Sequence, residues 1–168
     1  MKDKIKKILI DNDLYKAPID VVKLANIFGL TIFQQELDYD GAILSKKDGF
    51  EIDGEKCYKA ILININQIPT RKRFTIAHEL AHWIVTPESD RNNLYAHRDD
   101  NLTGFNDEPE INDIASELLM PYGLIKEALN DTNYKYGITP SIIYLIADLF
   151  NVSYAAAQVR IEKFQRGL

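Results

Sequence analysis

The chain has 168 residues, of which 46% are hydrophobic and 27% are charged. This length is enough for one domain with a sizeable core, and the composition is ordinary for a soluble globular protein. The net charge of −5 argues against non-specific nucleic-acid binding as the main activity. Because Cys57 is the single cysteine, it forms no internal disulfide and no cysteine-based zinc site.

The sequence also argues against a membrane or secreted location. No apolar run approaches the roughly 18 residues that a membrane helix needs. The first ten residues are basic, but Asp11 ends their apolar part too early for a signal peptide. We therefore expect a cytoplasmic protein.

The first half of the chain predicts two helices followed by a small sheet. Amphipathic patterns indicate helices over residues 5–14 and 19–28, with Gly29 closing the second. Short runs with β-branched or alternating residues then predict strands, and the Asp-Gly turns between them favour a three-stranded antiparallel sheet. The expected strands are residues 31–37, 41–45 and 58–65.

The next element carries the strongest chemical signal. Residues 71–85 read RKRFTIAHELAHWIV, a helical pattern that contains His-Glu-x-x-His. On a helix, His78 and His82 stand one turn apart on the same face, so both imidazoles can reach one metal ion. Pro69 and Thr70 form a plausible start signal for this helix.

This pattern points to metal-assisted hydrolysis of an amide bond. A catalytic zinc takes three protein ligands and keeps one position for water, whose pKa falls to about 7. Glu79 lies beside the first histidine, where its carboxylate can take the proton of that water and pass it to a leaving amine. A single histidine on an apolar helix face is more often a packed core residue. Here, two of the chain's 3 histidines fall in one five-residue motif.

The second half predicts a long polar loop and then helices. Residues 87–109 are rich in Asp, Asn and Ser, and a loop of that length is usually functional or disordered. Helices are expected over residues 109–120, 122–129, 140–150 and 153–164.

The third metal ligand must come from outside the first motif, because Val85 and Glu88 occupy the Gly and His positions of the longer His-Glu-x-x-His-x-x-Gly-x-x-His form. The acidic start of the second long helix is the natural source. Helical spacing favours Glu108, which also has Asn112 one turn later on its own face as a partner that can orient a ligand. Asp107, Glu110 and a loop residue stay open as alternatives.

A further polar group would stabilise the oxygen that becomes negative when water attacks a carbonyl. His97 and Tyr95 are the first candidates, and the sequence does not choose between them and Tyr122, Tyr134 or Tyr136. For each of them, a surface or packing role is the favoured interpretation.

Two linked motifs resemble the ImmA/IrrE family of metallo-endopeptidases. The first is the helix of residues 71–82, and the second is EPEINDIASELLMP at residues 108–121, where Pro109, Ile111 and Ile114 depart from the usual family pattern. The resemblance implies an α+β, zincin-like peptidase domain with His78, His82 and Glu108 as ligands of Zn²⁺, or of Mn²⁺ or another divalent ion. It also implies Glu79 as the catalytic carboxylate.

The resemblance further implies cleavage of a helix-turn-helix repressor, which here would be a separate protein. We expect a single domain over residues 1–168, with a core over 1–125 and a helical extension over 126–168. The extension has a helix-turn-helix rhythm with Arg160, but the net acidity makes nucleic-acid binding an unfavoured reading. The alternative function is a non-catalytic metal-binding module, such as an antitoxin or a repressor-binding partner. The oligomeric state is not predicted.

Overall fold

The structure is a computed structural model of the chain. It describes residues 1–168 apart from 98–107, 131, 133, 135, 136 and 168, and apart from the side chains of Ala96, His97 and Glu108. The chain divides into two compact units, one formed by Val21–Ala115 and the other by Met1–Asp20 together with Ser116–Leu168. The division falls inside one helix. The single domain expected from the sequence stays a prediction.

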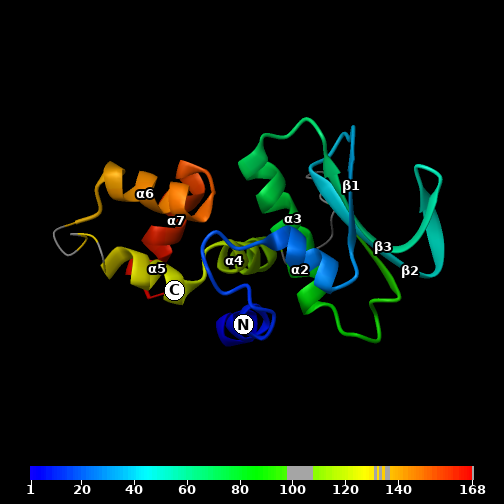
Figure 1. The fold of residues 1–168 in the computed structure, drawn as a ribbon, viewed down its shortest axis with the longest axis horizontal. Coiled ribbons are helices and arrows are strands. Elements are labelled where there is room, and N and C mark those ends of the chain that lie inside the picture. Colours follow the sequence, from blue (N-terminus) through cyan, green and yellow to red (C-terminus); the bar gives the residue numbers. More distant parts are fainter. Residues whose placement is uncertain (98–107, 131, 133, 135–136, 168) are drawn as a thin grey trace. The chain divides into compact units, whose positions relative to one another are not determined.

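The unit Val21–Ala115 holds the sheet, two whole helices and the first part of a third (Figure 1). The helices are α2 (Val21–Ile27), α3 (Pro69–Val85) and α4 (Glu108–Leu119), of which α4 crosses the division at Ala115. The strands are β1 (Thr31–Gln35), β2 (Gly41–Ile52), β3 (Glu55–Asn64) and β4 (Asn93–His97).

The mixed α+β class is confirmed, but the predicted three-stranded antiparallel sheet is wrong. The sheet has four strands in the order β1-β3-β2-β4, and β1 pairs with β3 in parallel. The fourth strand lies inside the segment that the sequence predicted to be a loop. Its five residues, NLYAH, are too few and too polar to stand out by pattern. Pairing with the long β2, not local propensity, makes them a strand.

The parallel pairing of β1 follows from the path of residues 36–40. A turn at Asp40-Gly41 would place β2 beside β1, but the chain instead crosses to the far side of β3. Asn64 holds this crossing, because its Nδ2 donates to the carbonyls of Leu37 (2.7 Å) and Tyr39 (3.4 Å). Its Oδ1 accepts from the backbone N–H of Asn66 at 3.0 Å. The Asn64 side chain at the end of β3 therefore fixes the segment that leads into β2.

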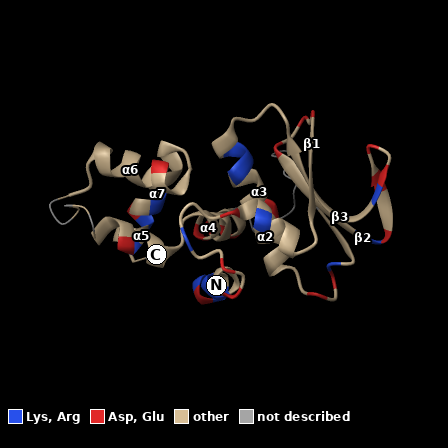
Figure 2. Cartoon of the chain, in the orientation of Figure 1, with Lys and Arg blue, Asp and Glu red and all other residues tan. Residues whose placement is uncertain are grey.

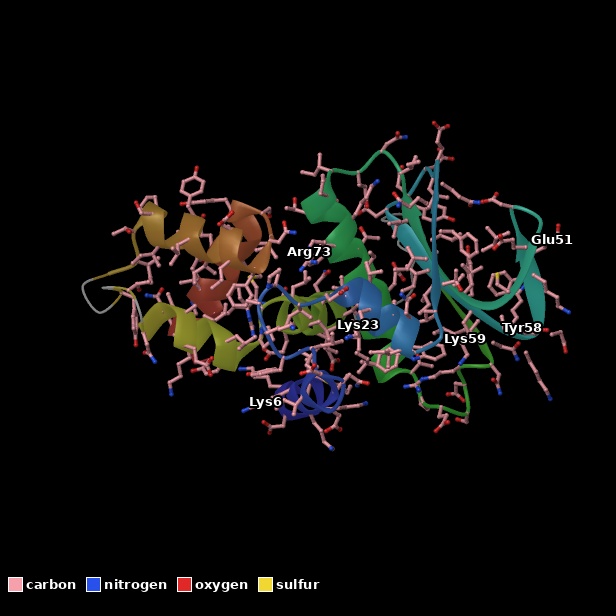
Figure 3. The ribbon with its side chains drawn as sticks, viewed as in Figure 1. Lys6, Lys23, Glu51, Tyr58, Lys59 and Arg73 are labelled. Atoms are coloured by element: carbon pink, nitrogen blue, oxygen red, sulfur yellow. The ribbon has the colours of Figure 1, made fainter. Side chains whose placement is uncertain are left out.

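The two faces of the sheet have different partners. Gln34 accepts from Lys72 on α3 at 2.7 Å, and Lys59 (Figure 3) lies 5.1 Å from the centre of the Trp83 ring on α3. Because strand side chains alternate, the other face belongs to a separate apolar cluster. That cluster consists of Ile52, Ala60 and Leu62, with Phe33, Leu37, Leu44, Phe50 and Cys57 packed around them.

The unit formed by the two ends of the chain is helical. Its elements are α1 (Lys2–Asp11), the end of α4, α5 (Tyr122–Asn130), α6 (Pro140–Phe150) and α7 (Tyr154–Gln165). All the helices predicted in the sequence are present, with ends that differ by a few residues. Thr139 and Ser153 cap α6 and α7 through their side-chain oxygens.

A buried ion pair lies at the centre of this unit. The guanidinium of Arg160 on α7 contacts the Glu117 carboxylate, and its Nε donates to the carbonyl of Met120 at 3.0 Å. The second oxygen of Glu117 accepts from the backbone N–H of Tyr122 at 3.0 Å. Both side chains are at most 7% exposed. Arg160, which the sequence placed on a helix-turn-helix-like surface, is thus held inside its own unit.

The helix pair α6 and α7 has few charged residues available on its surface. Figure 2 shows α6 almost without charge, since Asp148 is its one ionisable side chain apart from tyrosine. No single helix among the described residues is long and apolar enough to cross a membrane, although α6 and α7 together, bent by 108°, pass that test of length and composition.

We expect replacement of Arg160 by Met to lower the free energy of unfolding by about 3–5 kcal/mol, because the Glu117 charge would be left buried without its partner. Denaturant unfolding followed by circular dichroism measures this change. The matched control is Lys7→Met, which breaks the exposed pair with Asp11 on α1 and should cost no more than about 1 kcal/mol. A similar loss for both variants would contradict this account.

Candidate metal centre

The helix α3 forms where the sequence predicted it, with Pro69 at its first position. Proline suits this position because its missing N–H would be unsatisfied there in any case. The buried face of α3 includes Thr75, His78 and Glu79 among its apolar residues, and each of these three is at most 2% exposed. These three polar side chains of α3 are therefore buried. Burial of polar side chains is unusual unless their polar atoms have hydrogen-bond or metal partners.

The end of α3 is fixed by two side chains beyond it. Thr86 Oγ1 donates to the carbonyl of His82 at 2.7 Å. Arg91 Nε donates to the carbonyls of Trp83 and Thr86, both at 3.1 Å, and its guanidinium lies 4.8 Å from the centre of the Trp83 ring. These bonds satisfy carbonyls that the helix leaves without partners and place a cation at its negative end. They hold the turn that carries His82.

The two histidine rings converge. The Nε2 atoms of His78 and His82 are 3.2 Å apart, and the ring centres are 4.9 Å apart. Two nitrogens bound to one tetrahedral zinc at about 2.05 Å each are separated by about 3.3 Å. The separation in this structure therefore fits two ligands of the same ion, and the donor atoms are of the type that zinc prefers.

Asn112 orients the first histidine. Its Oδ1 accepts from the Nδ1–H of His78 at 3.1 Å. A proton held on Nδ1 leaves the lone pair of Nε2 free to bind metal, which is the usual arrangement around a metal-binding imidazole. The sequence predicted Asn112 as an orienting residue but gave it Glu108 as a partner. In the structure its recorded partner is His78.

The protonation state of His82 also suits a metal ligand. Burial lowers the pKa of His82 below its usual 6.5, because the charged imidazolium is poorly solvated there. The neutral ring, which is the form that binds metal, is therefore favoured at neutral pH.

Glu79 lies against the first residue of β2. A Cβ built on Gly41 would be 3.6 Å from Glu79 Oε1, so the carboxylate reaches the strand backbone at a place without a side chain. Glu79 itself is 1% exposed. The residue that the sequence predicts to be the catalytic carboxylate is thus positioned next to both histidines on α3 and beside the sheet.

The third ligand predicted from the sequence falls at the edge of what the structure describes. Glu108 begins α4, but its side chain lies outside the described residues, as does all of Asp107. Within the described side chains, no group of three or more His, Cys, Asp or Glu residues is arranged to hold a metal ion. The backbone nevertheless places residue 108 one turn before Asn112 on the same helix face.

The residues predicted to stabilise an oxyanion lie in different parts of the structure. Tyr95 pairs with Leu44, so alternation places it on the face of the sheet that does not pack against α3, where it is 55% exposed. Tyr95 nevertheless lies close enough to Tyr39 to raise the pKa of that tyrosine, and its expected role stays a prediction. His97 pairs with Ala42 through its backbone, and its side chain is not described. Tyr122 and Tyr134 belong to the other unit, and Tyr136 lies outside the described residues.

Sequence reasoning missed Tyr39, which precedes β2. Burial, then the neighbouring Tyr95 and Glu79, raise the pKa of Tyr39, so its phenol is neutral at physiological pH and lies within electrostatic reach of Glu79. No spacing rule links Tyr39 to the histidine motif, because the crossing from β1 to β2 brings them together. A tyrosine immediately before the Asp-Gly turn carried no signal of its own.

Comparison with known protein families gives a match over most of the chain. The Peptidase_M78 family model, described as the IrrE N-terminal-like domain, matches residues 28–162. The chain belongs to this peptidase family. The family resemblance predicted from the sequence is confirmed, and membership implies a metal cofactor in general terms. No curated protein matches the chain significantly.

The lowered pKa of His82 predicts how the stability of the metal-free protein depends on pH. As the pH falls below about 6.5, the imidazole of the unfolded chain takes up a proton that the folded chain does not, so the folded state loses stability. The free energy of unfolding is measured between pH 7.5 and 5 for the metal-free wild type and for metal-free His82→Gln. Below about pH 6.5 the wild type should lose more of this free energy than the variant. Parallel curves would contradict the prediction, because they would show that the His82 imidazole titrates alike in the folded and unfolded chains.

Proposed function

We propose that this protein is a zinc-dependent endopeptidase of the cytoplasm that cleaves a separate helix-turn-helix transcriptional repressor. The observation that carries the peptidase part is the pair of Nε2 atoms 3.2 Å apart on α3, with Glu79 between the two histidines in sequence. Family membership supports peptide hydrolysis. The repressor as substrate, and a zincin-like arrangement of the whole site, rest on the resemblance of the two sequence motifs.

The proposed ligands are His78, His82 and Glu108. Asn112 contacts His78 and shares a helix face with residue 108, which supports Glu108 as the third ligand. A carboxylate completes the two-histidine set found in many catalytic zinc sites. Manganese or iron suits the same donors, since relative affinity alone does not select the metal in a cell.

The chemistry then follows from the positions of the side chains. A bound divalent ion supplies Lewis acidity, which lowers the pKa of water and polarises a carbonyl. Glu79 accepts the proton of the attacking water and donates it to the nitrogen of the leaving amine. Its burial excludes bulk water, which would otherwise compete for the carboxylate. Asn112 keeps the His78 ring in one tautomer during this cycle.

We expect Glu79→Gln to lower the rate of peptide cleavage by at least about 100-fold while zinc remains bound, because the amide cannot carry the proton. The substrates would be a panel of purified helix-turn-helix repressors from the same genome, with new C-termini identified by mass spectrometry in ¹⁸O-labelled water. Glu162→Gln, at an exposed site on α7, is the matched control and should cleave like the wild type. Equal cleavage by Glu79→Gln and the wild type would remove the mechanism.

We expect Glu108→Gln to weaken zinc binding by at least about 100-fold, because loss of a direct ligand exceeds the 10–100-fold effect of a residue that only orients one. Competition with a chromogenic chelator measures this affinity. Glu162→Gln again serves as the control. If Glu108→Gln binds zinc normally and Asp107→Asn does not, the third ligand is Asp107 instead.

A further inference from the structure

Gly41, the first residue of β2, lies unusually close to α3. A Cβ on Gly41 would lie 2.4 Å from Thr75 Cγ2 and 2.7 Å from the carbonyl oxygen of Leu62. Both distances are far below a van der Waals contact, so residue 41 must be glycine for the strand to sit here. The same added Cβ would lie 3.6 Å from Glu79 Oε1, so no side chain of residue 41 stands between the strand and the Glu79 carboxylate. The carboxylate of Glu79 therefore lies beside the strand.

The preceding residue holds the strand in this place. The carboxylate of Asp40 contacts the guanidinium of Arg71 and accepts from Gln67 Nε2 at 2.7 Å. Thr75 Oγ1 donates to Gln67 Oε1 at 3.1 Å. The carbonyl of Asp40 also accepts from the backbone N–H of Asn64 at 3.0 Å. Asp40 is thus bonded both to the helix and to the sheet.

The contacts on α3 follow one line along the helix. Arg71, Thr75 and Glu79 are spaced four residues apart, so they lie on neighbouring turns of one face. Arg71 binds Asp40, Thr75 touches Gly41, and Glu79 comes next on the same face. The ion pair at one end of this line and the carboxylate at the other are linked through the backbone of residues 40 and 41.

Stability alone gives little reason for this arrangement. The side chains of Arg71 and Asp40 are 41% and 29% exposed, and ion pairs this exposed contribute about 0–1 kcal/mol to folding. The placement of a catalytic group matters far more, because a displacement of about 1 Å can cost about 100-fold in rate. A small ion pair can therefore have a large effect on catalysis if it sets the position of Glu79.

We propose that Asp40 and Gly41, anchored by Arg71 and Gln67, form a positioning element that holds the Glu79 carboxylate in its working orientation. Neither residue touches the reacting atoms. Their role is to keep the strand backbone against the carboxylate and so restrict its rotamers. This inference rests on the proposed function, in which Glu79 moves the proton.

The first experiment measures kinetics on the zinc-loaded protein. Asp40→Asn and Arg71→Met should each lower kcat by about 10- to 100-fold, with KM changed less than about 2-fold and zinc content unchanged. The double variant should be no worse than the poorer single variant, because both remove the same interaction. The control is Asp11→Asn, which breaks the exposed Lys7–Asp11 pair on α1 and should leave kcat unchanged. Wild-type kcat in both single variants would overturn the proposal.

The second experiment needs neither metal nor substrate. In the metal-free protein with ¹³C-labelled glutamate, the Glu79 carboxyl resonance is assigned by its loss in Glu79→Gln. Asp40→Asn and Arg71→Met should shift or broaden this resonance, and Asp11→Asn should not. An unchanged resonance in both variants would overturn the positioning role. If the wild type cleaves no repressor, the proposed function fails, yet this measurement still decides whether Asp40 positions Glu79.

Discussion

The burial of ionisable side chains on α3 is the constraint on which the rest of this structure depends. Placing His78 and Glu79 where at most 1% of their surface is exposed is unfavourable unless their polar atoms have partners. Asn112 supplies one partner, and the second histidine lies at the separation that a shared metal ion requires. Much of the surrounding architecture can be understood as support for this one helix.

The sheet provides that support on one face only. Gln34, Gly41 and Lys59 meet α3 at successive points, while Leu44, Ala60 and Leu62 turn to a separate apolar cluster. Period-two alternation thus decides which strand residues can face α3. It places Gly41 beside Glu79 and directs the ring of Tyr95 to the other face. The close approach of Thr75 and of the Leu62 carbonyl explains why a glycine, rather than a larger residue, borders the carboxylate.

The helical unit formed by the chain ends shows a different use of charge. Arg160 and Glu117 are buried together, and the pair also binds a carbonyl and an N–H of the main chain at the end of α4. A pair of this kind tends to specify one packing arrangement rather than to raise stability over an apolar alternative. It also removes the best-placed arginine from the surface of α7. Packing within the unit is therefore enough to explain the helix-turn-helix rhythm of α6 and α7.

The sequence by itself determined the elements whose signal is local. The spacing of His78, Glu79 and His82 follows from the period of a helix, and the helix ends follow from proline, glycine and capping residues. The family was also evident, because two motifs stood in the right order. The tertiary structure alone decided that β1 runs parallel to β3, that five polar residues form β4, and that Tyr39 lies near Glu79. These features depend on pairing between segments distant in the chain, and such pairing leaves no periodic trace in either segment.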